Sequence, residues 1–390
     1  MRTRRLGVTA ATAAVAVLGL AACSSNLAGG GDATVSEDGP ITIGVLVDQT
    51  AYLKTVDDGV LTGINAAIES INADGGVLGR DLVTVVADTA ADPQTQVQSF
   101  QKVQSQNEPV LFINGFSSAG NAATAPIAQS AGIPMIVSSV VPVDDPEWVF
   151  STITPARYET GIRVDYIKEL GVKSVAVLHD PTPYNKALLE TLTAQLTEAG
   201  MTLSGAEEHA SDAVDLAPQV AKLLSGNPEA LIKLSAGPTQ IVAAKALADA
   251  GSSIPYLLGI DSRANLVQAT AVYDHVYFAA APLQVARELE ANEKSAAIDR
   301  FLEVNPDLQD PTYVGRGWDA VYIAAQAIEA AGSTDGDAIR QALIDMGAYE
   351  GTSGSYDYTD EDHYGITVNP DYVGHFEGEV AKIVYRPEGR

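Results

Sequence analysis

The sequence is short of the residues that hold metals and covalent cross-links. Its 390 residues include one cysteine, Cys23, and five histidines. A single cysteine cannot form a disulfide within the chain. No two histidines are three or four residues apart, so the spacing typical of a zinc site is absent as well. We therefore predict neither a metal site nor a cofactor.

Basic residues and long apolar runs are also scarce. The chain has 23 Lys and Arg against 50 Asp and Glu, for a formal net charge of −27. Such an acidic chain is repelled by phosphate backbones, which argues against a nucleic-acid partner. After residue 22 no apolar run is long enough to span a bilayer. The length suffices for two domains, each with its own core.

The longest apolar run lies at the N-terminus. A basic segment, Met1–Arg5, precedes the run Leu6–Leu20, and Leu-Ala-Ala-Cys then ends at Cys23. This pattern predicts a cleaved signal peptide over residues 1–22, and its end resembles a bacterial lipobox, in which the cysteine is diacylated. The alternative is a free thiol after an ordinary signal peptide. Residues 23–39 are rich in Gly, Ser and Asp and predict a flexible tether.

Short apolar strands alternate with amphipathic helices from residue 40 onward. The run Ile41–Val47 is followed by Val60, Ile64 and Ile71 at helical spacing, and the alternation restarts near Pro155. The predicted strands are 41–47, 82–88, 110–115, 133–139, 174–179, 230–234, 256–260 and 380–385. The pattern predicts an α/β protein with two doubly wound, parallel-sheet lobes. Ligands of such folds bind beyond the carboxyl ends of the strands.

A Gly-Phe-Ser-Ser-Ala-Gly segment follows the third predicted strand. A serine there can be a nucleophile in a Gly-x-Ser-x-Gly elbow, or part of a cradle for an anion at a helix N-terminus. The elbow pattern fails in both registers, because Ala119 or Phe116 replaces one glycine. A nucleophile would also need a histidine, which the sequence alone does not place. Ser117 and Ser118 can instead cap the next helix, with or without an anion bound.

The segment from about Ile41 to Tyr385 resembles the leucine/isoleucine/valine-binding family of type I periplasmic binding proteins, the solute receptors of ABC importers. The matching stretches are ITIGVLV, GINAAIESINADGGVLGRDLVTVVADTAADP, the serine segment, SVAVLHDPTPYNKALLETL, GIDSRANL, TYVGRGWDAVYIAAQAI and YEGTSGSYDYTDED. The resemblance implies two lobes joined by a three-crossover hinge. Lobe 1 would comprise 40–153 plus 283–362, and lobe 2 would comprise 154–282 plus 367–390.

For the first lobe, the resemblance implies a carboxylate anchor at Ser118, beside Ser117. Ser139 falls where relatives offer a backbone carbonyl. Val141 replaces a threonine, so that one hydroxyl contact would be absent.

For the second lobe, Tyr184 matches a wall tyrosine, and Asp261 falls where an acid meets the ligand ammonium. Ala236 replaces a wall tyrosine and would enlarge the site. Trp318, within the 283–362 part of the first lobe, lies near another aromatic position. Each has an alternative: Tyr184 on the surface, Asp261 as a helix cap, and Trp318 in the core.

Together these features predict a non-enzymatic, extracytoplasmic solute-binding protein that is anchored to the cell membrane by a lipid on Cys23. We expect a monomer that binds a small amino acid or another small organic carboxylate and delivers it to an ABC permease. Two alternatives stay open. The protein could be the ligand-binding partner of a membrane receptor that senses its closed, ligand-bound form. It could also be a secreted serine hydrolase that uses Ser118.

Overall fold

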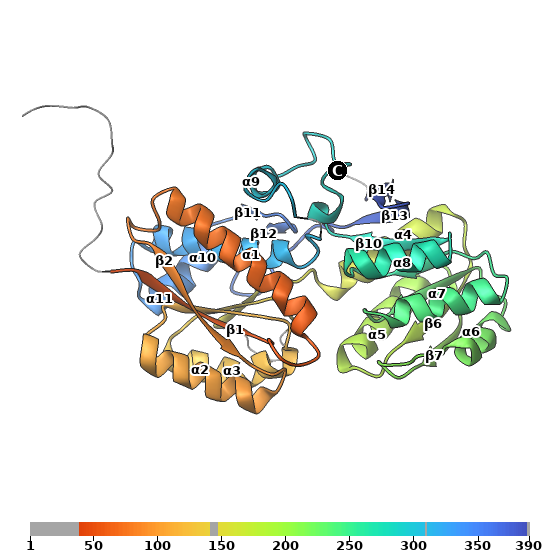
Figure 1. Ribbon diagram of the computed structural model, residues 1–390, viewed down its shortest axis with the longest axis horizontal. Coiled ribbons are helices and arrows are strands. Elements are labelled where there is room, and N and C mark those ends of the chain that lie inside the picture. Colours follow the sequence, from red (N-terminus) through yellow and green to blue (C-terminus); the bar gives the residue numbers. More distant parts are fainter. Residues whose placement is uncertain (1–38, 141–146, 309, 388–390) are drawn as a thin grey trace, which may run out of the picture. The chain divides into compact units, whose positions relative to one another are not determined.

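The computed structural model describes residues 39–140, 147–308 and 310–387, which all belong to one compact unit (Figure 1). Cys23, the predicted signal peptide and tether, and Val141 lie outside the described residues. The unit holds a five-stranded and a seven-stranded sheet, both mostly parallel and both flanked by helices. The α/β class predicted from the strand–helix alternation is confirmed.

The first sheet is entirely parallel, in the order β2-β1-β3-β4-β5. Its elements in chain order are β1 (Ile41–Val47), α1 (Lys54–Ala73), β2 (Leu82–Asp88), α2 (Pro93–Asn107), β3 (Leu111–Asn114), α3 (Ser118–Ala131), β4 (Met135–Val137) and β5 (Val149–Ser151). Figure 1 shows α2 and α3 on one face and α1 with α10 (Val314–Ala331) on the other.

Alternating side chains of the first-sheet strands supply two separate cores, because successive strand residues point to opposite faces. Ile43 and Val45 of β1 pack in the cluster that contains residues of α1 and α10. Leu46 and Phe112 pack with Phe100 in the cluster between the sheet and α2 and α3. Both faces are buried, which explains why β1 reads as a continuous apolar run rather than as an alternating one.

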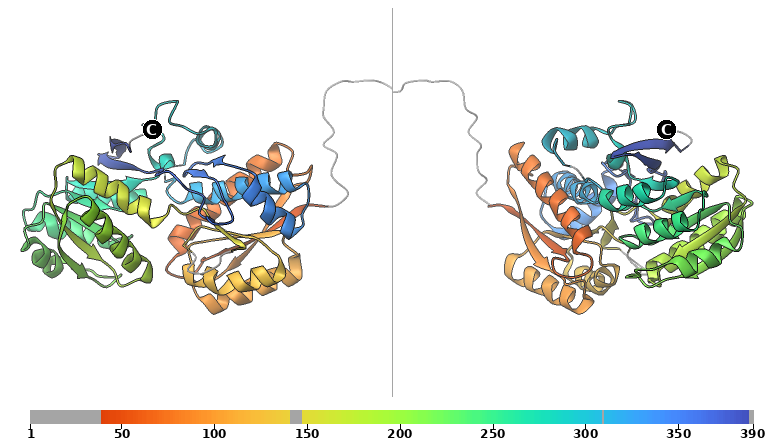
Figure 2. Two further views of the ribbon diagram at one scale, coloured as in Figure 1. Left: turned by 180° about the vertical axis from the view of Figure 1, so that it is seen from behind. Right: turned by 45° about the vertical axis from the view of Figure 1, so that its right-hand side comes forward.

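The second sheet has the order β14-β13-β10-β9-β8-β6-β7. Its elements are α4 (Ala156–Glu169), β6 (Ser174–His179), α5 (Pro183–Glu198), β7 (Thr202–Glu208), α6 (Ala217–Leu224), β8 (Ala230–Leu234), α7 (Thr239–Asp249), β9 (Tyr256–Leu258), α8 (Arg263–Val272), β10 (Val276–Ala280), β13 (Tyr372–Glu377) and β14 (Val380–Tyr385). The two views of Figure 2 show β13 and β14 in dark blue at the edge of this sheet. There β13 pairs antiparallel with β10 and with β14.

The chain passes between the two sheets three times. It leaves β5 for α4, returns after β10 through a short 3-10 helix, η1 (Pro282–Val285), and leaves again for β13 after a small hairpin. The intervening elements are α9 (Ala296–Val304), α10, α11 (Gly336–Asp345), β11 (Tyr349–Glu350) and β12 (Ser355–Tyr356). No helix in the described residues is long and apolar enough to cross a membrane.

Two glycines let α10 lie directly on α1. A side chain at Gly63 would collide with the carbonyl oxygen of Val314, and one at Gly317 would collide with the carbonyl oxygen of Val60. Glycine has no Cβ, so the two backbones can approach this closely. The contact fixes the first turn of α10, which matters because that turn carries part of the candidate site.

Candidate ligand-binding site

The β3–α3 turn contains two serines, of which one caps α3 and the other has a hydroxyl that is unpaired in the described part of the chain. Ser117 is the N-cap of α3, and its buried hydroxyl accepts a hydrogen bond from the Gly120 amide at 3.2 Å. Ser118 is the first helical residue and is half-buried, and its hydroxyl has no partner among the residues that the structure describes. The first amides of a helix also lack partners within the helix and favour an anion. Ser118 and the α3 tip can therefore receive a small anion.

A buried acid holds this turn in place. Asp57 of α1 accepts hydrogen bonds from the amide of Asp48 at 2.6 Å and from the amide of Phe116 at 2.8 Å. Burial raises the pKa of Asp57 to about 6, although both amides act in the opposite direction. No local sequence pattern indicates this role, because Asp57 lies 59 positions before Phe116.

An arginine that the sequence analysis did not select lies against the same turn. Arg316, in the first turn of α10, is only 7% exposed, and its Nη1 atom has no hydrogen-bond partner in the described residues. Its guanidinium carbon lies 4.9 Å from the centroid of the Phe116 ring and 5.8 Å from that of Tyr313. The two rings pack edge to face at 5.4 Å. A cation on aromatic faces next to a helix N-terminus strengthens the attraction for an anion.

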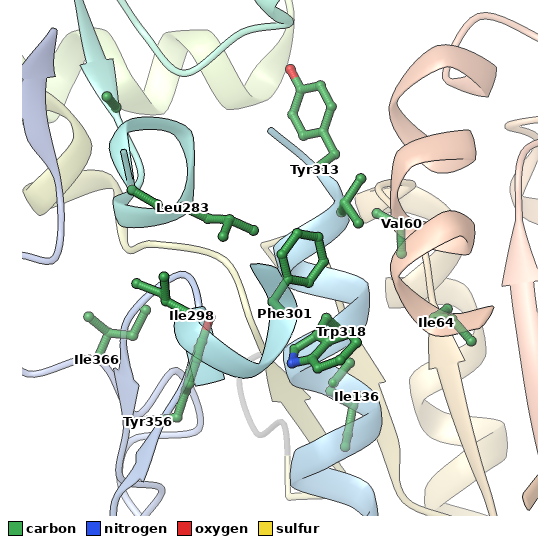
Figure 3. Close-up of a cluster of buried hydrophobic side chains, with 14 of the residues drawn as sticks. Val60, Ile64, Ile136, Leu283, Ile298, Phe301, Tyr313, Trp318, Tyr356 and Ile366 are labelled. Atoms are coloured by element: carbon green, nitrogen blue, oxygen red, sulfur yellow. The ribbon is translucent and has the colours of Figure 1, made fainter. Parts of the chain in front are cut away.

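Trp318 occupies the core instead. It is fully buried, and its ring packs against Phe301 at 5.2 Å and Tyr322 at 4.8 Å. Figure 3 shows Trp318 beside Phe301, whereas Tyr313, at the start of the same helix, points away from this cluster. Packing therefore accounts for Trp318, as the alternative interpretation held, and we do not keep it among the candidate ligand contacts.

Ser139, beyond β4, is engaged within the protein. Its hydroxyl accepts a hydrogen bond from the side chain of Asn121 at 2.9 Å, and its carbonyl accepts one from the Ser151 hydroxyl at 3.0 Å. Asn121 also binds the carbonyl of Gly115, so that the network links β4 to the serine turn. A carbonyl can accept a second hydrogen bond, and the contact predicted for Ser139 stays a prediction.

Tyr184, at the start of α5 beside the second sheet, points at an acid that the sequence analysis missed. Its hydroxyl donates to Glu159 Oε2 at 2.7 Å, and Glu159 Oε1 lies 3.5 Å from Arg163. Burial and the neighbouring Glu159 raise the pKa of Tyr184, while the charge of Arg316 acts in the opposite direction. Arg316, on α10 against the first sheet, is therefore within electrostatic range of Tyr184, on α5 beside the second sheet.

Asp261, after β9, is also committed to internal partners. It is 3% exposed and accepts hydrogen bonds from the amide of Gly237 at 2.7 Å, the amide of Ser262 at 2.6 Å and the side chain of Asn265 at 3.1 Å. Burial raises its pKa. Ser262 is the N-cap of α8, so Asp261 supports the cap rather than forming it. Ala236, next to the Gly237 amide, is exposed.

A buried lysine lies beneath the Ser235–Gly237 turn. Lys233 of β8 is fully buried and donates to the hydroxyls of Ser235 and of Thr239, the latter at 2.9 Å. The Ser235 hydroxyl also lies 3.4 Å from His209 Nε2. Burial lowers the pKa of Lys233 to about 7, against the pull of Asp180 and Asp261. The apolar run Ala230–Leu234 predicted a strand here, but not the polar cluster at its end.

Three other histidines are engaged by backbone carbonyls or an aromatic ring. His179 and His375 each share a ring nitrogen hydrogen bond with a backbone carbonyl, at 2.9 and 2.8 Å. The His363 ring stacks on Phe150 with centroids 4.5 Å apart. Across the described residues, no group of three or more His, Cys, Asp or Glu is placed to hold a metal ion.

Comparison with known proteins identifies the family. The family model described as "Periplasmic binding protein" matches residues 40–372, well over half of the chain. The chain belongs to this periplasmic binding protein family. The family expected from the quoted stretches is therefore confirmed.

Curated relatives and solved structures agree. A Leu/Ile/Val-binding protein homolog 3 from Brucella melitensis is 26% identical over 82% of this chain and 87% of its own length. A leucine-, isoleucine-, valine-, threonine- and alanine-binding protein from Pseudomonas aeruginosa is 28% identical over 72% and 76%. Two structures match at 19% identity, each covering 89% of this chain and 100% of the other. They are an extracellular ligand-binding receptor from Rhodopseudomonas palustris, with a TM-score of 0.77, and LivJ from Streptococcus pneumoniae in complex with isoleucine, with a TM-score of 0.73. At this identity the structures establish the type I fold alone.

Proposed function

We propose that this protein is an extracytoplasmic solute-binding lipoprotein of an ABC importer. It binds a small amino acid or another small organic carboxylate between the turns of its two sheets. The proposal extends to the lipid on Cys23, the membrane location, the permease partner and the monomeric state. The names of two relatives, which state amino-acid binding, support an amino-acid or similar small ligand.

One observation carries the proposal. The free hydroxyl of Ser118 lies at the unpaired N-terminus of α3, and the buried cation Arg316 lies on the ring of Phe116 in the same turn. Together they offer a hydroxyl, backbone amides and a guanidinium to one small anion, which are the donors that a carboxylate accepts best. No comparable observation favours a hydrolase, so we do not pursue that alternative.

We place the hinge in the three passages between the sheets. The halves would be residues 40–153 plus 283–362, and 154–282 plus 367–390. Closure about these passages would bring Tyr184 and the Ser235–Gly237 turn over a ligand held at Ser118, and would exclude water from the charged groups. Val141 and Ser139 remain proposed contacts on the first half, and Asp261 and Ala236 on the second.

The test is the thermal midpoint in the presence of a panel of amino acids and simple carboxylates. A true ligand at about one hundred times its dissociation constant stabilises the protein by about 2.7 kcal/mol. Ser118→Ala should weaken that ligand about tenfold, because one hydrogen bond to a charged group is lost.

The matched control is Ser105→Ala. Ser105 is exposed near the end of α2, and its hydroxyl donates only to a carbonyl of its own helix. It should bind as the wild type does. If no carboxylate shifts the midpoint while a neutral solute does, or if both variants bind equally well, the proposal is wrong.

A further inference from the structure

Arg316 is a buried cation without a counter-charge. Within the described residues it takes part in no ion pair, and its Nη1 atom has no acceptor, although the side chain is 93% buried. Its surroundings are the faces of Phe116 and Tyr313. A buried charge that lacks a partner is unfavourable unless something else supplies one. The residue is thus poised to gain from an incoming anion.

The acids of the first half are already occupied by backbone amides. Asp319, one turn further along α10, accepts from the amides of Thr352 at 2.7 Å and Ser353 at 2.9 Å. It also accepts from the Tyr356 hydroxyl at 3.3 Å. Asp57 binds two further amides, one of them that of Phe116. Both acids shape loops, and neither is paired with Arg316.

The acids of the second half are occupied as well. An ionised carboxylate has about four acceptor positions. Asp261 uses three of them while almost fully buried. Glu159 binds the Tyr184 hydroxyl and the guanidinium of Arg163. A ligand ammonium would have to compete with these partners, whereas a ligand carboxylate finds Ser118, the α3 amides and Arg316 unpaired.

We propose that the ligand is an organic acid that carries a carboxylate but no ammonium group, and that Arg316 determines this specificity. The carboxylate is bound by Arg316 together with Ser118 and the tip of α3, and an apolar or aromatic body packs on Phe116, Tyr313 and Tyr184. This inference rests on the proposed function, because it assigns the ligand class of the same site.

The experiment compares ligands that differ in one group. Leucine is paired with 4-methylpentanoate, and phenylalanine with 3-phenylpropanoate. The neutral amides 4-methylpentanamide and 3-phenylpropanamide complete the series. Dissociation constants are measured by calorimetry for the wild type, Arg316→Gln and Arg316→Lys. The control is Arg300→Gln, because Arg300 lies on α9 in a partly exposed ion pair with Asp74, at 2.7 Å.

We expect at least one ammonium-free acid to bind the wild type ten times more tightly than its amino acid and its amide. Arg316→Gln should weaken that acid by about tenfold to 150-fold, which corresponds to a charged hydrogen bond of about 1.5–3 kcal/mol. It should also abolish the preference for acid over amide, which a purely structural change would leave intact. Arg316→Lys keeps the charge without the planar fork and should lie between. Arg300→Gln should match the wild type.

Several results would overturn the inference. If the amino acids bind more tightly and Arg316→Gln has no effect, the ligand class is wrong while the proposed function stands. If the acids are preferred but the preference survives in both Arg316 variants, Arg316 is not its source. If no member of either series binds, the proposed function fails together with this inference. Folding of each variant is checked by circular dichroism, and Arg316→Lys provides the readout should Arg316→Gln not fold.

Discussion

The turn after β3 and the turn after β8 lie at the carboxyl ends of their strands, one in each sheet, and they are built alike. In each, a buried acid from another element binds a backbone amide of the turn. Asp57 binds the amide of Phe116 at 2.8 Å, and Asp261 binds the amide of Gly237 at 2.7 Å. Both acids have a raised pKa because of burial. The backbone of each turn is therefore fixed before any ligand arrives.

The two turns differ in whether the buried basic side chain beside them is fully hydrogen-bonded within the protein. Lys233, below the second turn, donates to the hydroxyls of Ser235 and Thr239. Arg316, against the first turn, has aromatic faces around it and an unpaired nitrogen. The fold brings polar groups to both edges, but in the described residues the buried base is hydrogen-bonded at the second edge and has an unpaired nitrogen at the first. Being near a ligand site and being free to bind a ligand are thus separate properties.

The largest effect is expected from removing the acid that holds the first turn. Asp57→Ala leaves two buried amides, those of Asp48 and Phe116, without acceptors. An unsatisfied buried amide costs about 1–3 kcal/mol, so the free energy of unfolding in urea should fall by about 3 kcal/mol.

Asp58→Ala is the control for this change, since Asp58 is half exposed in an ion pair with Lys54. Exposed pairs contribute about 0–1 kcal/mol. A loss in Asp57→Ala no greater than that of the control would show that the turn does not depend on its acid.

A somewhat smaller effect is expected from Lys233, and it depends on pH. The folded pKa of about 7 lies below the ordinary value of 10.5. Between these values the unfolded chain holds a proton that the folded chain has released, so stability increases as the pH rises from about 7 towards 10.5. In Lys233→Met this increase is absent. The wild type should therefore gain on the order of 2 kcal/mol relative to the variant between pH 7 and pH 9.

The titratable groups near Lys233 are kept in both proteins, but the charge of Lys233 acts to lower the pKa of His209 and of Asp261, so its removal shifts their titration as well. They include Asp180, Asp261 and His209, which belong to the same cluster. Lys245→Met serves as the control, because Lys245 is exposed in a pair with Asp249. A wild-type-minus-variant difference that stays flat from pH 7 to pH 9, as in the control, would mean that Lys233 remains charged in its buried position.

The fold could be predicted from the sequence because its signals are local. Apolar runs such as Ile41–Val47 and Leu82–Asp88 are strands with those same bounds, and helices between them follow the predicted spacing. The predictions missed the short strands β5, β11 and β12, and also β7 (Thr202–Glu208), β10 (Val276–Ala280) and β13 (Tyr372–Glu377). β7 is a partly exposed edge strand with few apolar residues, and β13 takes an antiparallel place that alternation does not anticipate.

The site could be predicted only in part because pairing is not local. The helix start at Ser117 and Ser118 was evident from a strand, a turn and an Ala-rich run. Ser117 rather than Ser118 accepts a hydrogen bond from the Gly120 amide, which leaves the Ser118 hydroxyl available to a ligand. The acid that supports the turn is identified only by a distant contact, that of Asp57 with the amide of Phe116. The sequence analysis named Trp318 and not Arg316 as a candidate ligand contact for the same reason, because packing between distant residues is not visible in the sequence. The two lie two positions apart, and only packing against Phe301 or Phe116 separates core from site.

The smallest change in unfolding free energy, measured without ligand, should come from replacing Arg316. This measurement distinguishes a buried base that lacks a partner from one that is hydrogen-bonded. Arg316→Met removes a desolvated charge that lacks a partner, and loses cation–π contacts of about 0.5–1 kcal/mol each. These two contributions oppose each other, so the unfolding free energy should change by less than about 1 kcal/mol.

Arg163→Met is the matched comparison, since Arg163 is fully buried but donates to the carbonyls of Glu159 and Lys233. Leaving these carbonyls without their donor should cost about 1–3 kcal/mol. Equal losses in the two variants would mean that Arg316 is a structural residue rather than one held ready for an anion.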